Sequence, residues 1–177
     1  MSCHLTATLK TLRQSILVIG YGNELRGDDG VGQRVARAVA EWRVPNLRSL
    51  AVHQLTPELA EELAVVDRAI FVDAYTEATP QEVRVCPLEP AHSVATTGHT
   101  SDPQMLLAIA QALYNAHPQA WWVGIPAVNF ELSNDLSPIA SQGMEEALEE
   151  IDRLIKHQPS PPHTTLPNGK KQLVDII

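Results

Sequence analysis

The stretch Ser15-Ile-Leu-Val-Ile-Gly-Tyr-Gly-Asn-Glu-Leu-Arg-Gly-Asp-Asp-Gly-Val-Gly32 joins an apolar run, a glycine-rich turn and two adjacent acids. Residues 16–19 are continuously apolar and rich in β-branched side chains, which predicts a strand buried on both faces. Apolar residues then recur at helical spacing from Val31, so we expect a helix to begin near Asp29 or Gly30. The stretch therefore predicts a strand, a tight loop and a helix, the opening unit of an α/β fold.

The two acids of this stretch, Asp28 and Asp29, fall near the start of that helix. Free backbone N–H groups and the helix dipole favour carboxylates there, so helix capping is one interpretation. The glycines suggest a dinucleotide site, but the pattern G-x-G-x-x-G begun at Gly20 needs a glycine where Leu25 stands. No Gly-Lys-Ser/Thr closes a phosphate-binding P-loop either. Because two acids repel phosphate, the loop is better suited to a cation.

The composition predicts one soluble domain. At 177 residues the chain can bury one substantial core, and no internal repeat divides it. The formal net charge of -8 argues against nucleic acid and anionic membranes as partners, because both need clustered Lys or Arg. Cys3 and Cys86 cannot make a disulfide framework, and we recognise neither a secretory signal nor a membrane-spanning apolar run. We therefore expect a cytoplasmic protein.

Strand and helix signals alternate along the rest of the chain. Further strands are expected at residues 47–55, 68–74, 82–85 and 120–126. The alternating pattern of 82–85 indicates a half-exposed edge strand, with an antiparallel direction as one option. Helices are expected to begin where a small polar cap precedes proline, at Thr56-Pro57, Asp102-Pro103 and Ser137-Pro138. The helix after Asp102 is expected to pack through Leu106, Ile109, Ala110 and Leu113.

These elements predict an α/β fold of three layers, in which helices flank a twisted, mostly parallel but mixed sheet of about five strands. Residues 15–156 would form this single domain. Residues 1–14 lack a clear period and are interpreted as an N-terminal extension. The proline-rich composition of residues 157–177 predicts a disordered tail.

Three side chains are expected to meet at one edge of that sheet. Asp29 follows the first strand, Asp73 closes the third, and His99 lies in a polar loop just before a helix. In open α/β sheets the ligand crevice lies outside the carboxyl ends of the strands, so these side chains can converge there. Two carboxylates and an imidazole suit a divalent first-row metal. A turn role for Asp73 and a capping role for Asp29 are the structural alternatives.

The segment Gly20-Tyr-Gly-Asn-Glu-Leu-Arg-Gly-Asp-Asp-Gly-Val-Gly32 resembles the signature of the [NiFe]-hydrogenase maturation endopeptidases, roughly G-x-G-N-x-L-x-x-D-(D/E)-G-x-G. Every fixed position matches. Phe-Val-Asp-Ala at 71–74, Gly-His-Thr at 98–100 and Val-Gly-Ile-Pro at 123–126 follow in the family's order. The resemblance covers about residues 15–155. His-Gln-Leu-Thr-Pro-Glu-Leu at 53–59 is similar to the branch that serves soluble, bidirectional-type hydrogenases.

The resemblance implies a phosphorylase/hydrolase-like fold and a nickel site. In the family, the second acid of the signature, the aspartate ending the third strand and a loop histidine bind nickel, which implies Asp29, Asp73 and His99 here. His92 lies nearby in the same polar loop as His99. The supporting loop would be formed by Gly20, Gly22, Asn23, Asp28 and Gly30.

The activity implied by the resemblance is the removal of a short C-terminal extension from the nickel-loaded hydrogenase large-subunit precursor. The nickel would then belong to the substrate as much as to the enzyme. The catalytic group is not identified, and Asp29 is the first candidate. No G-x-S-x-G elbow or zinc-protease helix is present, and Cys86 has no visible histidine partner. A non-catalytic nickel or precursor chaperone, and a nucleotide-binding domain, are the alternative functions.

Overall fold

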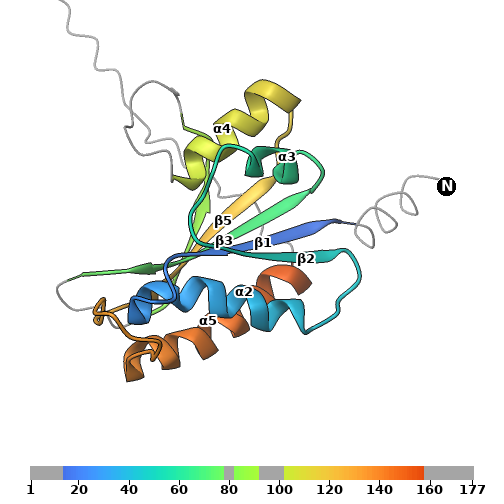
Figure 1. The fold of residues 1–177 in the computed structure, drawn as a ribbon. Coiled ribbons are helices and arrows are strands. Elements are labelled where there is room, and N and C mark those ends of the chain that lie inside the picture. The colour runs from blue at the N-terminus through green and yellow to red at the C-terminus, as the bar shows by residue number, and fades with distance from the viewer. Residues whose placement is uncertain (1–13, 78–81, 92–101, 158–177) are drawn as a thin grey trace, which may run out of the picture.

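The computed structural model describes residues 14–77, 82–91 and 102–157 (Figure 1). In these residues five strands form one sheet in the order β2-β1-β3-β5-β4. The strands are β1 (Ile16–Tyr21), β2 (Leu47–Val52), β3 (Arg68–Tyr75), β4 (Arg84–Leu88) and β5 (Gln119–Pro126). Neighbours pair in parallel except β4, which pairs antiparallel with β5 at the edge. The predicted mixed sheet and its half-exposed edge strand are confirmed.

Helices cover both faces of the sheet (Figure 1). They are the 3-10 helix η1 (Gly27–Gly30) and the α-helices α2 (Val31–Ala40), α3 (Leu59–Leu63), α4 (Pro103–Tyr114) and α5 (Pro138–Lys156). Buried side chains of α2 and α5 pack on one face and those of α3 and α4 on the other. The predicted three-layer α/β/α fold is therefore confirmed. Within the described ranges, no helix is both long enough and apolar enough to span a membrane.

Strand β1 lies inside the sheet and is buried along its whole length. Leu17 and Ile19 contribute to the core beneath α3 and α4, whereas Ile16 and Val18 contribute to the core beneath α2 and α5. Each such side chain stabilises the fold by roughly 1.5–3 kcal/mol when it is withdrawn from water. Because alternate residues are buried on opposite faces of the sheet, the sequence of this strand is continuously apolar.

Several expectations differ from the structure, and one is the edge strand predicted at 82–85, which runs from Arg84 to Leu88. Strand β2 ends at Val52 rather than at residue 55. Helix α3 starts only at Leu59, because Thr56 and Pro57 form tight turns whose carbonyls accept the N–H groups of Leu59 and Ala60. Leu113 was expected to face the core but is 71 % exposed. Residues 111–115 are all exposed, so the last turn of α4 extends beyond its packing partners. Residues 1–13 and 158–177, which include most of the predicted extension and tail, lie outside the described residues.

The start of α2 approaches the sheet through two glycines. A Cβ added to Gly32 would lie 2.4 Å from the Val72 carbonyl oxygen and 2.5 Å from that of Tyr21. A Cβ added to Gly20 would lie 1.8 Å from the carbonyl oxygen of Gly32. Both clashes are with backbone atoms, which cannot rotate away. The two glycines therefore hold the first turn of α2 against the ends of β1 and β3.

Replacing Gly32 with alanine tests this close approach. Helix propensity alone would make Gly32→Ala stabilising by up to about 1 kcal/mol. The backbone clash should instead lower the free energy of unfolding by about 2–3 kcal/mol, measured by chemical denaturation. A stabilised Gly32→Ala variant would show that α2 does not contact the sheet at this point.

Candidate functional site

Asp29 lies in η1, directly after the turn that follows β1. Its Oδ2 accepts the backbone N–H of Asn23 at 3.0 Å. Gly22 has a φ of +128°, and a Cβ there would lie 1.8 Å from the carbonyl oxygen of Asp29. Neither η1 nor α2 receives a side-chain cap. Asp29 is thus held by the glycine turn that wraps around it, in the first turn of η1 where the helix dipole favours an acid.

Asp73 lies near the carboxyl end of β3, where it pairs in register with Gly124 of β5. Burial raises the pKa of Asp73 to about 7, although the Ala74 N–H and the Tyr21 hydroxyl act to lower it. The nearby charge of Asp29 contributes to this raised pKa. The two carboxylates therefore lie close enough for the charge of Asp29 to act on Asp73.

Tyr21 is a neighbour of Asp73 that the sequence analysis did not single out. Burial, followed by the charge of Asp73, raises the pKa of the Tyr21 hydroxyl, which remains protonated. A hydrogen bond with Trp122 acts to lower this pKa, whereas the charge of Asp102, the N-cap residue of α4, acts to raise it. The hydroxyl consequently marks a point where β1, β3, β5 and the start of α4 meet. Strand alternation from Ile19 could have placed Tyr21 on this face of the sheet.

Asp28 has a different environment from Asp29, although the two are adjacent. Its side chain is fully buried. Oδ2 accepts the N–H groups of Val128 and Asn129, both at 2.9 Å, and the Ser137 hydroxyl at 2.7 Å. Oδ1 accepts the Ser137 N–H at 2.6 Å. Burial acts to raise the pKa of Asp28, but these hydrogen bonds outweigh it and lower the pKa. These hydrogen bonds thus favour the ionised carboxylate, which links the loop after β1 to the segment 128–137.

Backbone hydrogen bonds reinforce the link that Asp28 makes between the two loops. The Gly27 N–H donates to the Ser133 carbonyl at 2.7 Å, and the Asp28 N–H donates to the Asn129 carbonyl at 2.9 Å. In the opposite direction, the Ser133 N–H donates to the Leu25 carbonyl at 3.0 Å. The loop after β1 and the loop between β5 and α5 therefore form one unit at this edge of the sheet.

A chain of polar side chains holds the turn from the α2 side. Gln33 is buried, and its amide donates to the Gly22 carbonyl at 2.6 Å. Arg37 donates to the Gln33 amide oxygen at 3.2 Å and to a carboxylate oxygen of Glu24 at 2.7 Å. Because Asn23, which contacts Asp29, lies between Gly22 and Glu24, this chain limits how far the Asp29 carboxylate can shift.

The third predicted ligand cannot be placed. His99, like His92, lies outside the described residues. Among residues 14–77, 82–91 and 102–157, no three His, Cys, Asp or Glu side chains are grouped so that they could hold a metal ion. Of the three predicted ligands, only Asp29 and Asp73 lie within the described residues, and their role as ligands stays a prediction. Cys86, for which the sequence shows no histidine partner, is a free and exposed side chain on the edge strand β4.

Comparison with known proteins reveals similarity of structure. No family model and no curated protein matches the sequence. A [NiFe] hydrogenase maturation protease, HycI from Thermococcus kodakarensis KOD1, superposes with a TM-score of 0.66 at 20 % identity, over 86 % of this chain and 99 % of its own. The hydrogenase maturating endopeptidase HybD from E. coli superposes with a TM-score of 0.62 at 23 % identity, over 80 % of this chain and 92 % of its own. An endopeptidase from Escherichia coli superposes with a TM-score of 0.59 at 26 % identity, over 77 % of this chain and 89 % of its own.

The chain therefore has the fold of the [NiFe] hydrogenase maturation proteases. The resemblance seen in the sequence is confirmed at the level of the fold. The assignment to the branch of soluble, bidirectional-type hydrogenases stays a prediction.

Substitution of Asp28 tests its role as the link between the two loops. Asp28→Asn replaces one acceptor oxygen with an NH₂ group that faces a donor, so the free energy of unfolding should fall by about 2–3 kcal/mol. Urea denaturation measures this loss. The control is Asp135→Asn, which removes the same charge from an exposed position in the partner loop and should change stability by less than about 0.5 kcal/mol. Equal stability of the two variants would contradict a linking role.

The pKa of Asp73 can be measured by carbon-13 NMR on the metal-free protein in the presence of a chelator. We expect a midpoint near 7, which falls in Asp29→Asn because the neighbouring charge is removed. Since the folded pKa lies above the unfolded value, the stability contribution is full below about pH 4 and is lost as the pH rises towards 7. Asp73→Asn should abolish this pH dependence. A midpoint near 4 would show that Asp73 is solvated and distant from Asp29.

Proposed function

We propose that this chain is a peptidase that removes a C-terminal extension from the nickel-loaded large-subunit precursor of a [NiFe] hydrogenase. The observation that carries the proposal is the approach of Asp29 and Asp73 at the carboxyl edge of the sheet. This pair occurs in a chain that has the fold of proteins described as [NiFe] hydrogenase maturation proteases. Both residues follow strands at the edge where α/β folds bind their ligands, which supports them as the first two nickel ligands.

The chemistry of the pair fits a divalent cation. Asp73 has a raised pKa because burial and the Asp29 charge disfavour its ionised form. A bound cation would reverse this effect, since an opposite charge within a few ångströms favours ionised carboxylates. Two oxygen donors alone are few for nickel, so a third ligand is required, and an imidazole suits this metal.

His99 is our candidate for that third ligand. It precedes Asp102 by three residues, and three residues of extended chain span at most about 11 Å. The charge of Asp102 acts on the Tyr21 hydroxyl, which itself contacts Asp73. The short separation of His99 from Asp102 along the chain therefore supports His99 over the histidines of the predicted tail.

In the proposed mechanism, Asp29, Asp73 and His99 complete the coordination of nickel already carried by the precursor. Only a loaded precursor would then be held with its scissile peptide bond at the site. Hydrolysis adds a water oxygen to the scissile carbonyl carbon, breaks the C–N bond and transfers a proton to the leaving nitrogen. Asp29, oriented by the Asn23 N–H, is our first candidate for the base that accepts the proton from water. This assignment would make the enzyme an aspartic-type peptidase.

We place this reaction in the cytoplasm, with the precursor as protein partner. The two cysteines make no disulfide framework, which suits a reducing compartment. The formal net charge of -8 does not favour a nucleic-acid partner. We retain the soluble, bidirectional-type hydrogenase as the expected substrate source, on the residues at 53–59.

A processing assay tests the proposal. Purified protein is incubated with nickel-loaded and nickel-free precursor, and the precursor mass is measured. We expect cleavage of the loaded precursor only. Asp29→Asn, Asp73→Asn and His99→Ala should each lower the cleavage rate at least about a hundredfold, because loss of one ligand weakens the hold on nickel. Asp135→Asn, an exposed charge change in the adjoining loop, should cleave at the normal rate.

Two outcomes would contradict the proposal. An unchanged precursor mass with stable binding would indicate a chaperone, and cleavage by Asp29→Asn at the normal rate would exclude Asp29 from the site.

A nucleotide-binding domain predicts a rise in melting temperature with nucleotides. Leu25, which is 60 % exposed where the dinucleotide pattern needs glycine, argues against that alternative.

A further inference from the structure

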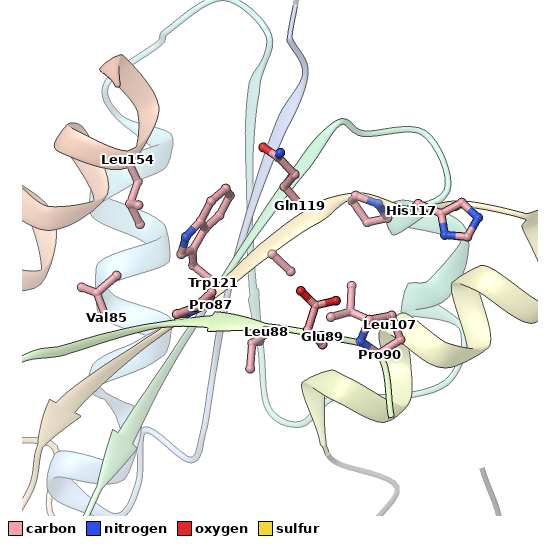
Figure 2. Close-up of a pocket in the computed structure, with 13 residues that line it drawn as sticks. Val85, Pro87, Leu88, Glu89, Pro90, Leu107, His117, Gln119, Trp121 and Leu154 are labelled. Carbon is pink, nitrogen blue, oxygen red and sulfur yellow. The ribbon is translucent and has the colours of Figure 1, made fainter. Parts of the chain in front are cut away.

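A cavity of about 480 Å³ opens at the β4 edge of the sheet (Figure 2). Its lining comes from both hydrophobic cores: Val85, Trp121 and Leu154 belong to the α2/α5 side, and Leu88 and Leu107 to the α3/α4 side. The cavity therefore straddles the sheet edge between the end of α4 and the end of α5. Three prolines also line the cavity: Pro87, Pro90 and Pro118.

This cavity is separate from the proposed nickel site. Its strand residues include Gln119 and Ala120 at the start of β5, whereas Asp73 pairs with Gly124. Five residues of strand separate Gln119 from Gly124, a distance of about 16 Å at about 3.3 Å per residue. Its lining is mainly apolar, with Glu89, His117 and Gln119 as its polar residues. It is therefore suited to aliphatic side chains.

The size of the cavity matches several side chains of a peptide. Apolar cavities of about 150 Å³ hold a benzene ring, so 480 Å³ has room for about three aliphatic side chains. Polar backbone of a peptide could remain at the open mouth, where Glu89 and His117 are exposed. An apolar peptide segment therefore fits better than a charged small molecule.

We infer that this cavity binds the chain's own segment Leu173-Val-Asp-Ile-Ile177. Helix α5 ends at Lys156, and Leu154 in its last turn lines the cavity. The Arg68 guanidinium donates to the Leu154 carbonyl at 2.9 Å, which fixes this turn beside the cavity. The described structure ends at His157, three residues after Leu154.

The sequence beyond His157 suits this role. Residues 158–172 are mainly polar and carry four prolines, and they precede the four aliphatic side chains of 173–177. A connecting segment of 15 residues can span up to about 50 Å, far more than a return to the cavity needs. Lys170 and Lys171 precede the apolar segment, opposite in charge to Glu89 at the cavity mouth. Covering the β4 edge in this way would also protect an exposed strand from pairing with other chains.

NMR of the isotope-labelled full-length chain tests the inference. We expect chemical shifts of residues 173–177 that differ from random coil, and contacts between their methyl groups and the Trp121 indole. Their amide exchange should be slowed about tenfold or more. The double substitution Val174→Asp with Ile176→Asp should abolish all three signs. Thr164→Asp with Thr165→Asp, which adds the same charge to the connecting segment, should leave them unchanged.

A second variant blocks the cavity rather than the segment. Ala116→Trp places a large side chain at a half-buried position of the wall and should release residues 173–177 to random-coil shifts. Random-coil shifts of this segment in the unaltered chain would overturn the inference. So would protection that appears only at concentrations where sedimentation shows a dimer, because the occupant would then come from a second copy.

Discussion

The arrangement of the candidate site depends on the buried carboxylate of Asp28. It accepts two backbone N–H groups of the loop after β5 and both donors of Ser137. Ser137 also caps α5 by accepting the Ala140 N–H at 3.3 Å. One carboxylate therefore joins the end of β1, the loop after β5 and the start of α5. Removing it would leave several buried donors without acceptors, which is more costly than the loss of an exposed ion pair.

The position of Asp29 follows from this linkage. The two acids are neighbours in η1, so a hydrogen-bond network that fixes the Asp28 backbone also fixes the starting point of the Asp29 side chain. Asp28 is surrounded by donors and keeps its charge at low pH, whereas Asp29 lies beside another carboxylate. The same residue type at two adjacent positions thus serves structure at one and is available for a ligand at the other. Environment, not residue identity, separates the two roles.

Local signals in the sequence predicted local structure well. The caps Asp102 and Ser137 accept the N–H groups of Gln104 and Ala140, as expected from a polar residue followed by proline. The location of Asp29 and Asp73 at one edge of the sheet was also predictable, because parallel strands bring their carboxyl ends to one edge. The hydrogen bonds of Asp28 with Val128 and Asn129 were not, since these residues lie about 100 positions away in a segment without a recognisable motif. The exposure of Leu113 depends on where α4 loses its packing partners, which helical spacing alone does not show.

The carboxylate pair also suggests why a site of this kind would act only on a metal-loaded substrate. Raising the pKa of Asp73 from 3.8 to about 7 corresponds to an ionisation cost on the order of 4 kcal/mol, of which burial is the larger part. A substrate that brings a cation recovers some of this cost on binding, whereas the same polypeptide without the cation recovers none. Each 1.4 kcal/mol so recovered favours the loaded substrate by about tenfold. Discrimination would then arise from the empty site being electrostatically unfavourable, without a separate element that senses the metal.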